Sequence, residues 1–155
     1  MRIIYRIISE ALLLISPIII LYRILKGKEN ISRISERYAI QSKYRKSGKL
    51  IWFHCSSVGE LLSIVPLIEK FENNIKINQI LVTTTTLSSS RIFSNFKFKK
   101  TIHQFFPIDT NFIVKRFLKY WKPKVCIFIE SEIWPNVIRN IKKQKLPLIL
   151  LNARI

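Results

Sequence analysis

From residue 50 onward, short apolar runs alternate with stretches of helical periodicity, and this alternation constrains the fold more than any other feature. The apolar runs predict strands at residues 50–55, 79–84, 101–106, 125–129 and 147–151. The stretches between them predict helices at residues 60–71, 88–96, 111–121 and 133–143. We therefore expect an α/β domain over residues 50–155, with a mostly parallel, doubly wound sheet of strand order 3-2-1-4-5.

A hydrophobic segment precedes this domain. Residues 11–22 carry no charge, and residues 3–25 are long enough for a bilayer span of about 20 residues if Arg6 and Glu10 lie near an interface. Basic residues follow in place of a signal-peptide cleavage site, which predicts that the domain stays in the cytoplasm. We expect residues 1–26 to form a membrane-anchor helix, spanning or monotopic. The alternative is a buried helix packed on a partner.

Residues 27–49 are polar and basic, and we expect a connector with a short helix around residues 31–38 and a loop after it. The chain has 27 Lys and Arg against 9 Asp and Glu, a net charge of +18 that is spread along its whole length. Such a surface favours anionic partners: nucleic acid, anionic lipid or a phosphorylated substrate. The hydrophobic segment counts against nucleic acid. Cys55 and Cys126 lack ligand spacing, so we expect buried thiols and no metal site.

Two carboxylates follow strands that the expected order makes neighbours. In a doubly wound sheet, ligands bind beyond the carboxyl ends of the strands, where the strand order reverses. The first strand leads into HCSSVGE, which ends at Glu60, and the fourth leads into ESEIWPN, which begins at Glu130. We therefore expect Glu60 and Glu130 to face one cleft. The alternative is that each is a helix-start acid, with Ser57 as an N-cap and Gly59 as a turn residue.

The remaining polar motifs are less specific. Residues 83–90 are rich in Thr and Ser, which suits either a phosphate or sugar contact or an N-capping loop. His103 lies inside a predicted strand and is interpreted as structural, and Asp109 as a turn or N-cap residue. The chain contains no GxGxxG, Walker-type GK[ST] or HExxH motif, so nicotinamide, P-loop and zincin chemistry have no support.

Several segments together resemble the 3-deoxy-D-manno-octulosonic acid (Kdo) transferases of lipopolysaccharide biosynthesis. They occur in the family's order and spacing: LIWFHCSSVGELLSIVPLIEKF from residue 50, HQFFPID at 103–109, FLKYWKP at 117–123, IESEIWPNVI at 129–138 and LPLILLNARI at 146–155. A GKE…ER pattern in the connector matches as well. The combination of SVGE with ESEIWPN is the specific part of the resemblance.

The resemblance implies the N-terminal domain of a membrane-associated, inverting glycosyltransferase of the GT-B type, with a Rossmann-like fold. Such an enzyme transfers Kdo from CMP-Kdo to a lipid A precursor (lipid IVA) at the cytoplasmic face of the bacterial inner membrane, without a cofactor or metal. The N-terminal domain holds the lipid acceptor and the C-terminal domain holds the donor. By motif match Glu60 is the catalytic base and Glu130 stabilises the transition state, with Ser57, Gly59, Thr84 and Asn136 as substrate-binding residues.

This sequence departs from the family at two places. Thr85 stands where the family has Gly, so we expect a crowded cleft or an altered turn. The chain ends after its NAR motif, so we expect an N-terminal half that lacks the donor-binding domain, binds an anionic membrane surface, and is inactive unless a C-terminal chain complements it. The alternative is a non-catalytic membrane-bound module that binds lipid A or phospholipid.

Overall fold

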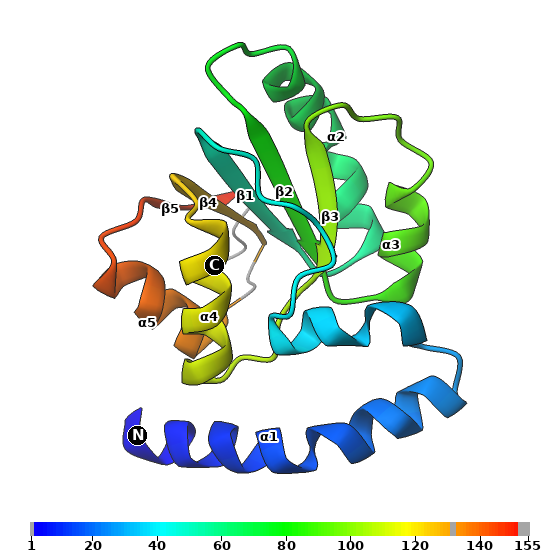
Figure 1. Cartoon of the computed structure of the whole chain (residues 1–155), viewed down its shortest axis with the longest axis vertical. Coiled ribbons are helices and arrows are strands. Elements are labelled where there is room, and N and C mark those ends of the chain that lie inside the picture. The colour runs from blue at the N-terminus through cyan, green and yellow to red at the C-terminus, as the bar shows by residue number, and fades with distance from the viewer. Residues whose placement is uncertain (1, 131–132, 152–155) are drawn as a thin grey trace.

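A parallel five-stranded sheet forms the centre of the molecule (Figure 1). The structure is a computed structural model that describes residues 2–130 and 133–151. The strands are β1 Leu50–Cys55, β2 Gln79–Thr84, β3 Thr101–Phe105, β4 Val125–Ile129 and β5 Leu148–Leu151. Their order is β3-β2-β1-β4-β5, and each neighbouring pair is parallel. The predicted α/β fold, Rossmann-like topology and strand order are therefore confirmed.

Helices cover both faces of the sheet, with α2 and α3 on one side and α4 and α5 on the other (Figure 1). Their bounds are α2 Val58–Glu72, α3 Leu87–Phe93, α4 Asn111–Trp121 and α5 Pro135–Lys143. Ser57, Thr86 and Thr110 are the N-caps of α2, α3 and α4, because each side-chain oxygen accepts a backbone N–H of the first helical turn. The helix predicted at residues 88–96 ends early, at Phe93.

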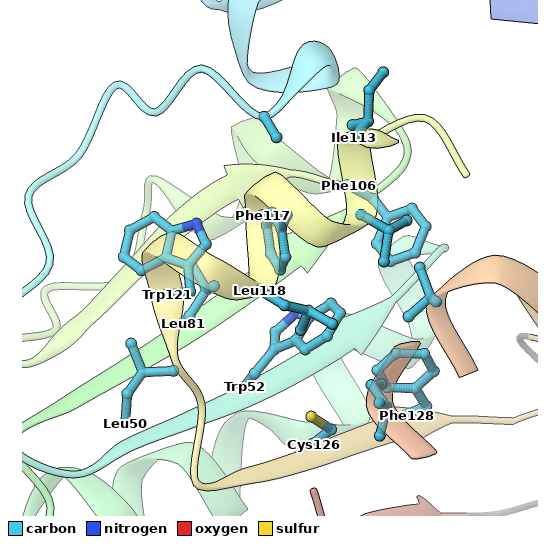
Figure 2. Packing of buried hydrophobic residues seen from close by; sticks show 14 residues of the cluster. Leu50, Trp52, Leu81, Phe106, Ile113, Phe117, Leu118, Trp121, Cys126 and Phe128 are labelled. Carbon is cyan, nitrogen blue, oxygen red and sulfur yellow. The ribbon is translucent and has the colours of Figure 1, made fainter. Parts of the chain in front are cut away.

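Each face of the sheet has its own hydrophobic core. On the face that α4 covers, Trp52 lies at the centre, with its ring centroid 4.8 Å from Phe117 and 5.1 Å from Phe128 (Figure 2). On the other face, Phe53 and Ile80 pack with α2 residues such as Leu61. Because β1 is buried on both faces, its sequence reads as a continuous apolar run, as is usual for central strands of parallel sheets. Both cysteines are buried, as predicted.

The N-terminal segment lies across the end of the domain where the strands have their carboxyl ends. Helix α1, Arg2–Leu25, runs along that end of the domain, and the 3-10 helix η1, Ile31–Tyr38, lies between it and the sheet (Figure 1). Several of the large apolar side chains of α1 are exposed, among them Leu14 at 82% and Leu25 at 78%. Among the described residues, no helix is long and apolar enough to cross a membrane.

Candidate active site

Glu60 is positioned by the turn that joins β1 to α2. One carboxylate oxygen, Oε2, accepts the backbone N–H of Ser56 at 2.8 Å, and Oε1 accepts the hydroxyl of Ser57 at 2.8 Å. In return, the Ser57 hydroxyl oxygen accepts the N–H of Glu60 at 3.2 Å. This reciprocal arrangement is a variant of the capping box, in which the carboxylate accepts the N–H of Ser56 in place of that of the N-cap Ser57, and it explains why Ser-x-x-Glu starts the helix here. Each carboxylate oxygen keeps a further lone pair, so the cap leaves Glu60 able to accept a proton.

The two other residues predicted near this turn differ in exposure. Ser57 is exposed at the helix start, and Gly59 is exposed in the first turn, where an added Cβ would meet nothing within 4 Å. The fold therefore does not require glycine at position 59. A substrate that approached the turn closely would be a reason for a glycine there. The role of Gly59 in substrate binding stays a prediction.

The loop after β2 contacts the same turn. Thr85 donates its hydroxyl hydrogen to the carbonyl oxygen of Ser56 at 3.0 Å, and its backbone is outside the left-handed region. The turn therefore accommodates Thr85 where the family has glycine. Thr84 is fully buried, and its hydroxyl is 2.9 Å from Nε2 of His103. Its predicted substrate contact would need this loop to move and stays a prediction.

Glu130 follows β4, next to the end of β1 in the sheet. Its backbone has a φ of 56°, in the left-handed region, which costs a residue with a Cβ about 1–2 kcal/mol. Its N–H donates to the carbonyl oxygen of Leu151 at 2.8 Å, and this bond holds the strained conformation. Glu132 lies outside the described residues. Glu60 and Glu130 thus leave adjacent strands, while their common cleft and roles remain predictions.

Asn136 begins the buried face of α5 and is held by a carboxylate from another loop. Asp109 accepts the backbone N–H groups of Asn136 and Val137 at 3.1 and 2.9 Å, so it caps α5. The N-cap of the helix that follows Asp109 in sequence is Thr110 instead. Asp109 also accepts the hydroxyl of Tyr5 at 2.9 Å, and the side chain of Asn136 donates to Ser9 at 3.2 Å. These bonds fasten α1 to the domain.

Burial raises the pKa values of both partners in the Tyr5–Asp109 contact. Desolvation is the largest cause for each, and the hydrogen bond to Asp109 raises the pKa of Tyr5 further. The N–H groups of Asn136 and Val137 and the Tyr5 hydroxyl oppose the rise for Asp109, because they stabilise its ionised form. In this contact the Tyr5 hydroxyl donates and Asp109 accepts, as it does from the two backbone N–H groups.

The connector, predicted as basic and with a short helix, carries a buried ion-pair network. Glu36 is fully buried and accepts two N–H groups of Arg33, at 2.8 and 2.9 Å, and the backbone N–H of Phe105 at 2.7 Å. Arg37 donates to the carbonyl oxygen of Thr85 at 2.8 Å and pairs with Glu29. Sequence reasoning missed this network. The one signal for it was the GKE…ER pattern, which contains Glu29, Glu36 and Arg37.

A cavity of about 440 Å³ lies between α1 and the carboxyl ends of the strands. We call it the α1 cavity. It has an apolar wall on α1, including Ile8 and Ile19, and aromatic side chains on the domain side, Phe106 and Trp134. Its charged lining residues are Arg23, Glu29, Arg37 and Asp109. The cavity therefore combines an apolar side with fixed charges, a combination that suits an amphipathic ligand.

Glu60 lies outside this lining but is linked to it. Its carboxylate holds the N–H of Ser56, the carbonyl oxygen of Ser56 holds the hydroxyl of Thr85, and Thr85 lines the α1 cavity. Among the described residues, no three His, Cys, Asp or Glu side chains gather as metal ligands. Glu60 is a carboxylate that can take part in proton transfer, and it is joined to the α1 cavity through Ser56 and Thr85.

Comparisons with known proteins show the family to which the chain belongs. The family model of 3-deoxy-D-manno-octulosonic-acid transferase matches residues 32–155. The chain is 43% identical to the 3-deoxy-D-manno-octulosonic acid transferase of Rickettsia bellii, over 97% of this chain and 36% of that protein. It is 40% identical to a probable mitochondrial transferase of the same name from Arabidopsis thaliana, over 98% of this chain and 35% of that protein.

A more distant relative, the transferase of Haemophilus influenzae, is 30% identical over 95% of this chain and 35% of that protein. The chain thus spans about a third of the length of these relatives, and it aligns with them over nearly all of its own length. Because the family model covers most of the chain, the predicted resemblance is confirmed, and the chain belongs to the family of 3-deoxy-D-manno-octulosonic acid (Kdo) transferases.

Proposed function

We propose that this chain forms the acceptor-binding part of an inverting Kdo transferase that moves Kdo from CMP-Kdo to a lipid A precursor such as lipid IVA. The observation that carries the proposal is the α1 cavity. An acyl chain would lie against Ile8 and Ile19, and a phosphate of the acceptor would lie near Arg23 and Arg37. A glycolipid acceptor has both an acyl chain and a phosphate, whereas a soluble sugar has no apolar part that would pack against the apolar wall.

In this proposal Glu60 removes a proton from the acceptor hydroxyl while the bond between Kdo and CMP breaks. Its place at the N-terminus of α2 favours the ionised carboxylate, because the helix dipole is positive there. A positioned base of this kind contributes about 10²–10⁴-fold to a reaction rate. Glu130, on the adjacent strand end, would stabilise charge in the transition state, with Ser57, Gly59, Thr84 and Asn136 shaping the substrate site.

CMP-Kdo would bind between this sheet and a second domain. The two thirds of the relatives' length that this chain does not match suggest such a domain in those proteins. We therefore expect the chain alone to show no measurable affinity for CMP-Kdo and to need the C-terminal part of the enzyme for turnover. A calorimetric titration that gave saturable micromolar binding, about −8 kcal/mol, would contradict this part of the proposal. The reaction would use no cofactor.

The enzyme would work at the cytoplasmic face of the bacterial inner membrane. The exposed apolar side chains of α1, Leu14 and Ile18 among them, support an interfacial helix that lies in the membrane surface. The net charge of +18 supports attraction to anionic lipids, where each nearby Lys or Arg contributes about 1 kcal/mol. A helix in the surface would also place the α1 cavity beside the lipids.

Acceptor binding can be tested with two neighbouring residues of α1. Ile19 lines the α1 cavity, whereas Ile18 is 69% exposed and lies outside the lining. Ile19 is 44% exposed, and a bound acyl chain would cover it. In detergent solution, Ile19→Asp should weaken binding of lipid IVA at least about tenfold, since fully burying an isoleucine contributes about 1.5–3 kcal/mol and a carboxylate would have to be desolvated. Ile18→Asp is the matched control and should change the affinity less than about twofold. Equal effects of the two changes would refute the cavity as the acceptor site.

A non-catalytic lipid-binding module would pass that binding test as well. The capping role of Glu60 is the observation that favours this second candidate, because it gives the residue a purpose without chemistry. Turnover with the C-terminal part supplied separates the two candidates, since only the enzyme would transfer Kdo.

A further inference from the structure

A second pocket, of about 550 Å³, opens at the β3 edge of the domain, beside η1 and α3. We call it the β3-edge pocket. Three of its lining residues are cations, Arg33, Lys43 and Arg91, and one is a carboxylate, Glu29. Glu29 is shared with the α1 cavity and is already paired with Arg23 and Arg37. Arg33 is likewise paired with the buried Glu36, so the excess positive charge of the β3-edge pocket comes from Lys43 and Arg91.

Hydrogen-bond donors accompany the cations. Ser90 accepts an N–H of Arg33 at 3.0 Å, so its own hydroxyl hydrogen remains available to a ligand. Asn30 accepts both the N–H and the hydroxyl of Ser32 at its Oδ1, which fixes the amide with Nδ2 as a donor. Arg33 itself is held rigidly, since its guanidinium also binds Glu36. Hydroxyl, amide and guanidinium donors of this kind are the groups that bind phosphate oxygens.

His103 forms the inner wall of the pocket and is a neutral side chain there. Arg33 donates to its Nδ1 at 2.9 Å, so Nε2 carries the proton and donates to Thr84. Burial is the largest cause that lowers the pKa of His103 to about 3, and the positive charges of Arg33, Arg37 and Lys43 lower it further. The neutral His103 therefore adds no charge of its own to the pocket.

From these features we infer that the β3-edge pocket binds a phosphomonoester group. Its two exposed cations, Lys43 and Arg91, supply charge for a dianion, and the fixed Arg33 with the Ser90 hydroxyl supplies directional hydrogen bonds. The inference goes beyond the proposed acceptor site, because no residue of α1 is in the lining of the β3-edge pocket, which shares only Glu29 with the α1 cavity. The phosphomonoester could belong to a soluble molecule or to a lipid headgroup, and the test below distinguishes these sources.

The test compares two charge-matched double variants of the whole chain. Lys43→Gln with Arg91→Gln removes the two exposed cations of the pocket. Lys115→Gln with Arg116→Gln removes one exposed Lys and one exposed Arg from α4. All four side chains are exposed, so both variants should melt within a few degrees of the parent. Each protein is titrated calorimetrically with inorganic phosphate and is sedimented with vesicles of phosphatidylcholine that contain either phosphatidic acid or phosphatidylglycerol at equal surface charge.

If the phosphomonoester is soluble, the pocket variant should bind inorganic phosphate at least tenfold more weakly, and the α4 variant should stay within twofold of the parent. If it is a lipid headgroup, the parent should prefer phosphatidic acid to phosphatidylglycerol vesicles at least fivefold, and only the pocket variant should lose that preference. The same losses in both variants, or no phosphate binding together with no preference for phosphatidic acid, would overturn the inference. Neither arm uses lipid IVA or the α1 cavity, so a failure here leaves the proposed acceptor site untouched.

Discussion

Replacing Glu60 separates its structural role from its proposed catalytic one. Glu60→Gln keeps an oxygen that can accept the N–H of Ser56, and its amide can donate to the hydroxyl oxygen of Ser57. A Gln at this position also completes a capping box. The variant loses only the interaction of a full negative charge with the helix dipole, about 0.3–1 kcal/mol. We therefore expect the free energy of unfolding to fall by less than about 1 kcal/mol.

Glu60→Ala removes the carboxylate from this turn, while the Ser57 hydroxyl still accepts the backbone N–H of residue 60. The N–H of Ser56 then loses its protein acceptor, and we expect a loss of about 1–2 kcal/mol in the free energy of unfolding. If Glu60 is the base, both variants should nevertheless lose about 10²–10⁴-fold in turnover, because neither an amide nor a methyl group accepts the acceptor's proton. Loss of activity should thus be similar in two proteins whose stabilities differ.

The assay measures Kdo transfer to lipid IVA with the C-terminal part of the enzyme supplied, beside urea unfolding of each variant. Glu69→Gln is the matched control, since it makes the same chemical change at an exposed position of the same helix. Turnover of Glu60→Gln within about threefold of the parent would refute the assignment of the base and leave Glu60 as a helix cap.

Four further outcomes are expected. Glu130→Gln should lower turnover in the same assay while acceptor binding is kept, and unchanged turnover would remove Glu130 from the site. Glu36→Ala should lower the free energy of unfolding by about 3–5 kcal/mol in urea, because it leaves the charge of Arg33 without its buried partner; a loss under about 1 kcal/mol would contradict this. Deleting residues 1–26 should release the protein from sedimented membranes, and an unchanged membrane fraction at high salt would be against an anchor there. The pKa of His103 is lowered, so the folded state binds a proton at this residue less readily than the unfolded chain does. The free energy of unfolding should therefore fall on acidification below about pH 6.5, and this residue should contribute at most about 1.4 kcal/mol per pH unit. His103→Gln should make that slope less steep.

The strands were predictable because their sequence signal is local. A central strand such as β1 is apolar on both faces, so the run from Leu50 to Cys55 is visible without knowledge of its neighbours. The Ser57 N-cap, which the sequence predicted only as an alternative, is equally local, and α2 starts at Val58, two residues before the predicted start. The parallel order followed from the alternation of strands and helices, because such chains adopt few topologies.

The connector was less predictable because its burial depends on partners far away in sequence. Glu36 and Arg37 are charged residues in a polar stretch, which by composition predicts exposure to solvent. Both are buried because their partners include Phe105 and Thr85, residues that only the folded sheet brings near. Asp109 shows the same limit: its sequence position suggests a turn or local cap, whereas the fold uses it to cap α5.

These long-range bonds explain why the connector is part of the candidate site as well as a link to α1. The backbone groups at and just after the carboxyl ends of the strands need hydrogen-bond partners, and leaving one buried and unpaired costs about 1–3 kcal/mol. Arg37 supplies such a partner to the carbonyl oxygens of Thr85 and Phe106, and Glu36 to the N–H of Phe105. Because these backbone groups have protein hydrogen-bond partners, the carboxyl ends of the strands need fewer bound water molecules, and the apolar side chains of α1 can pack against this end of the sheet. In the proposed function the lipid acceptor would occupy the α1 cavity, whose lining depends in part on a charged segment, Glu29 and Arg37, that does not contact the proposed base.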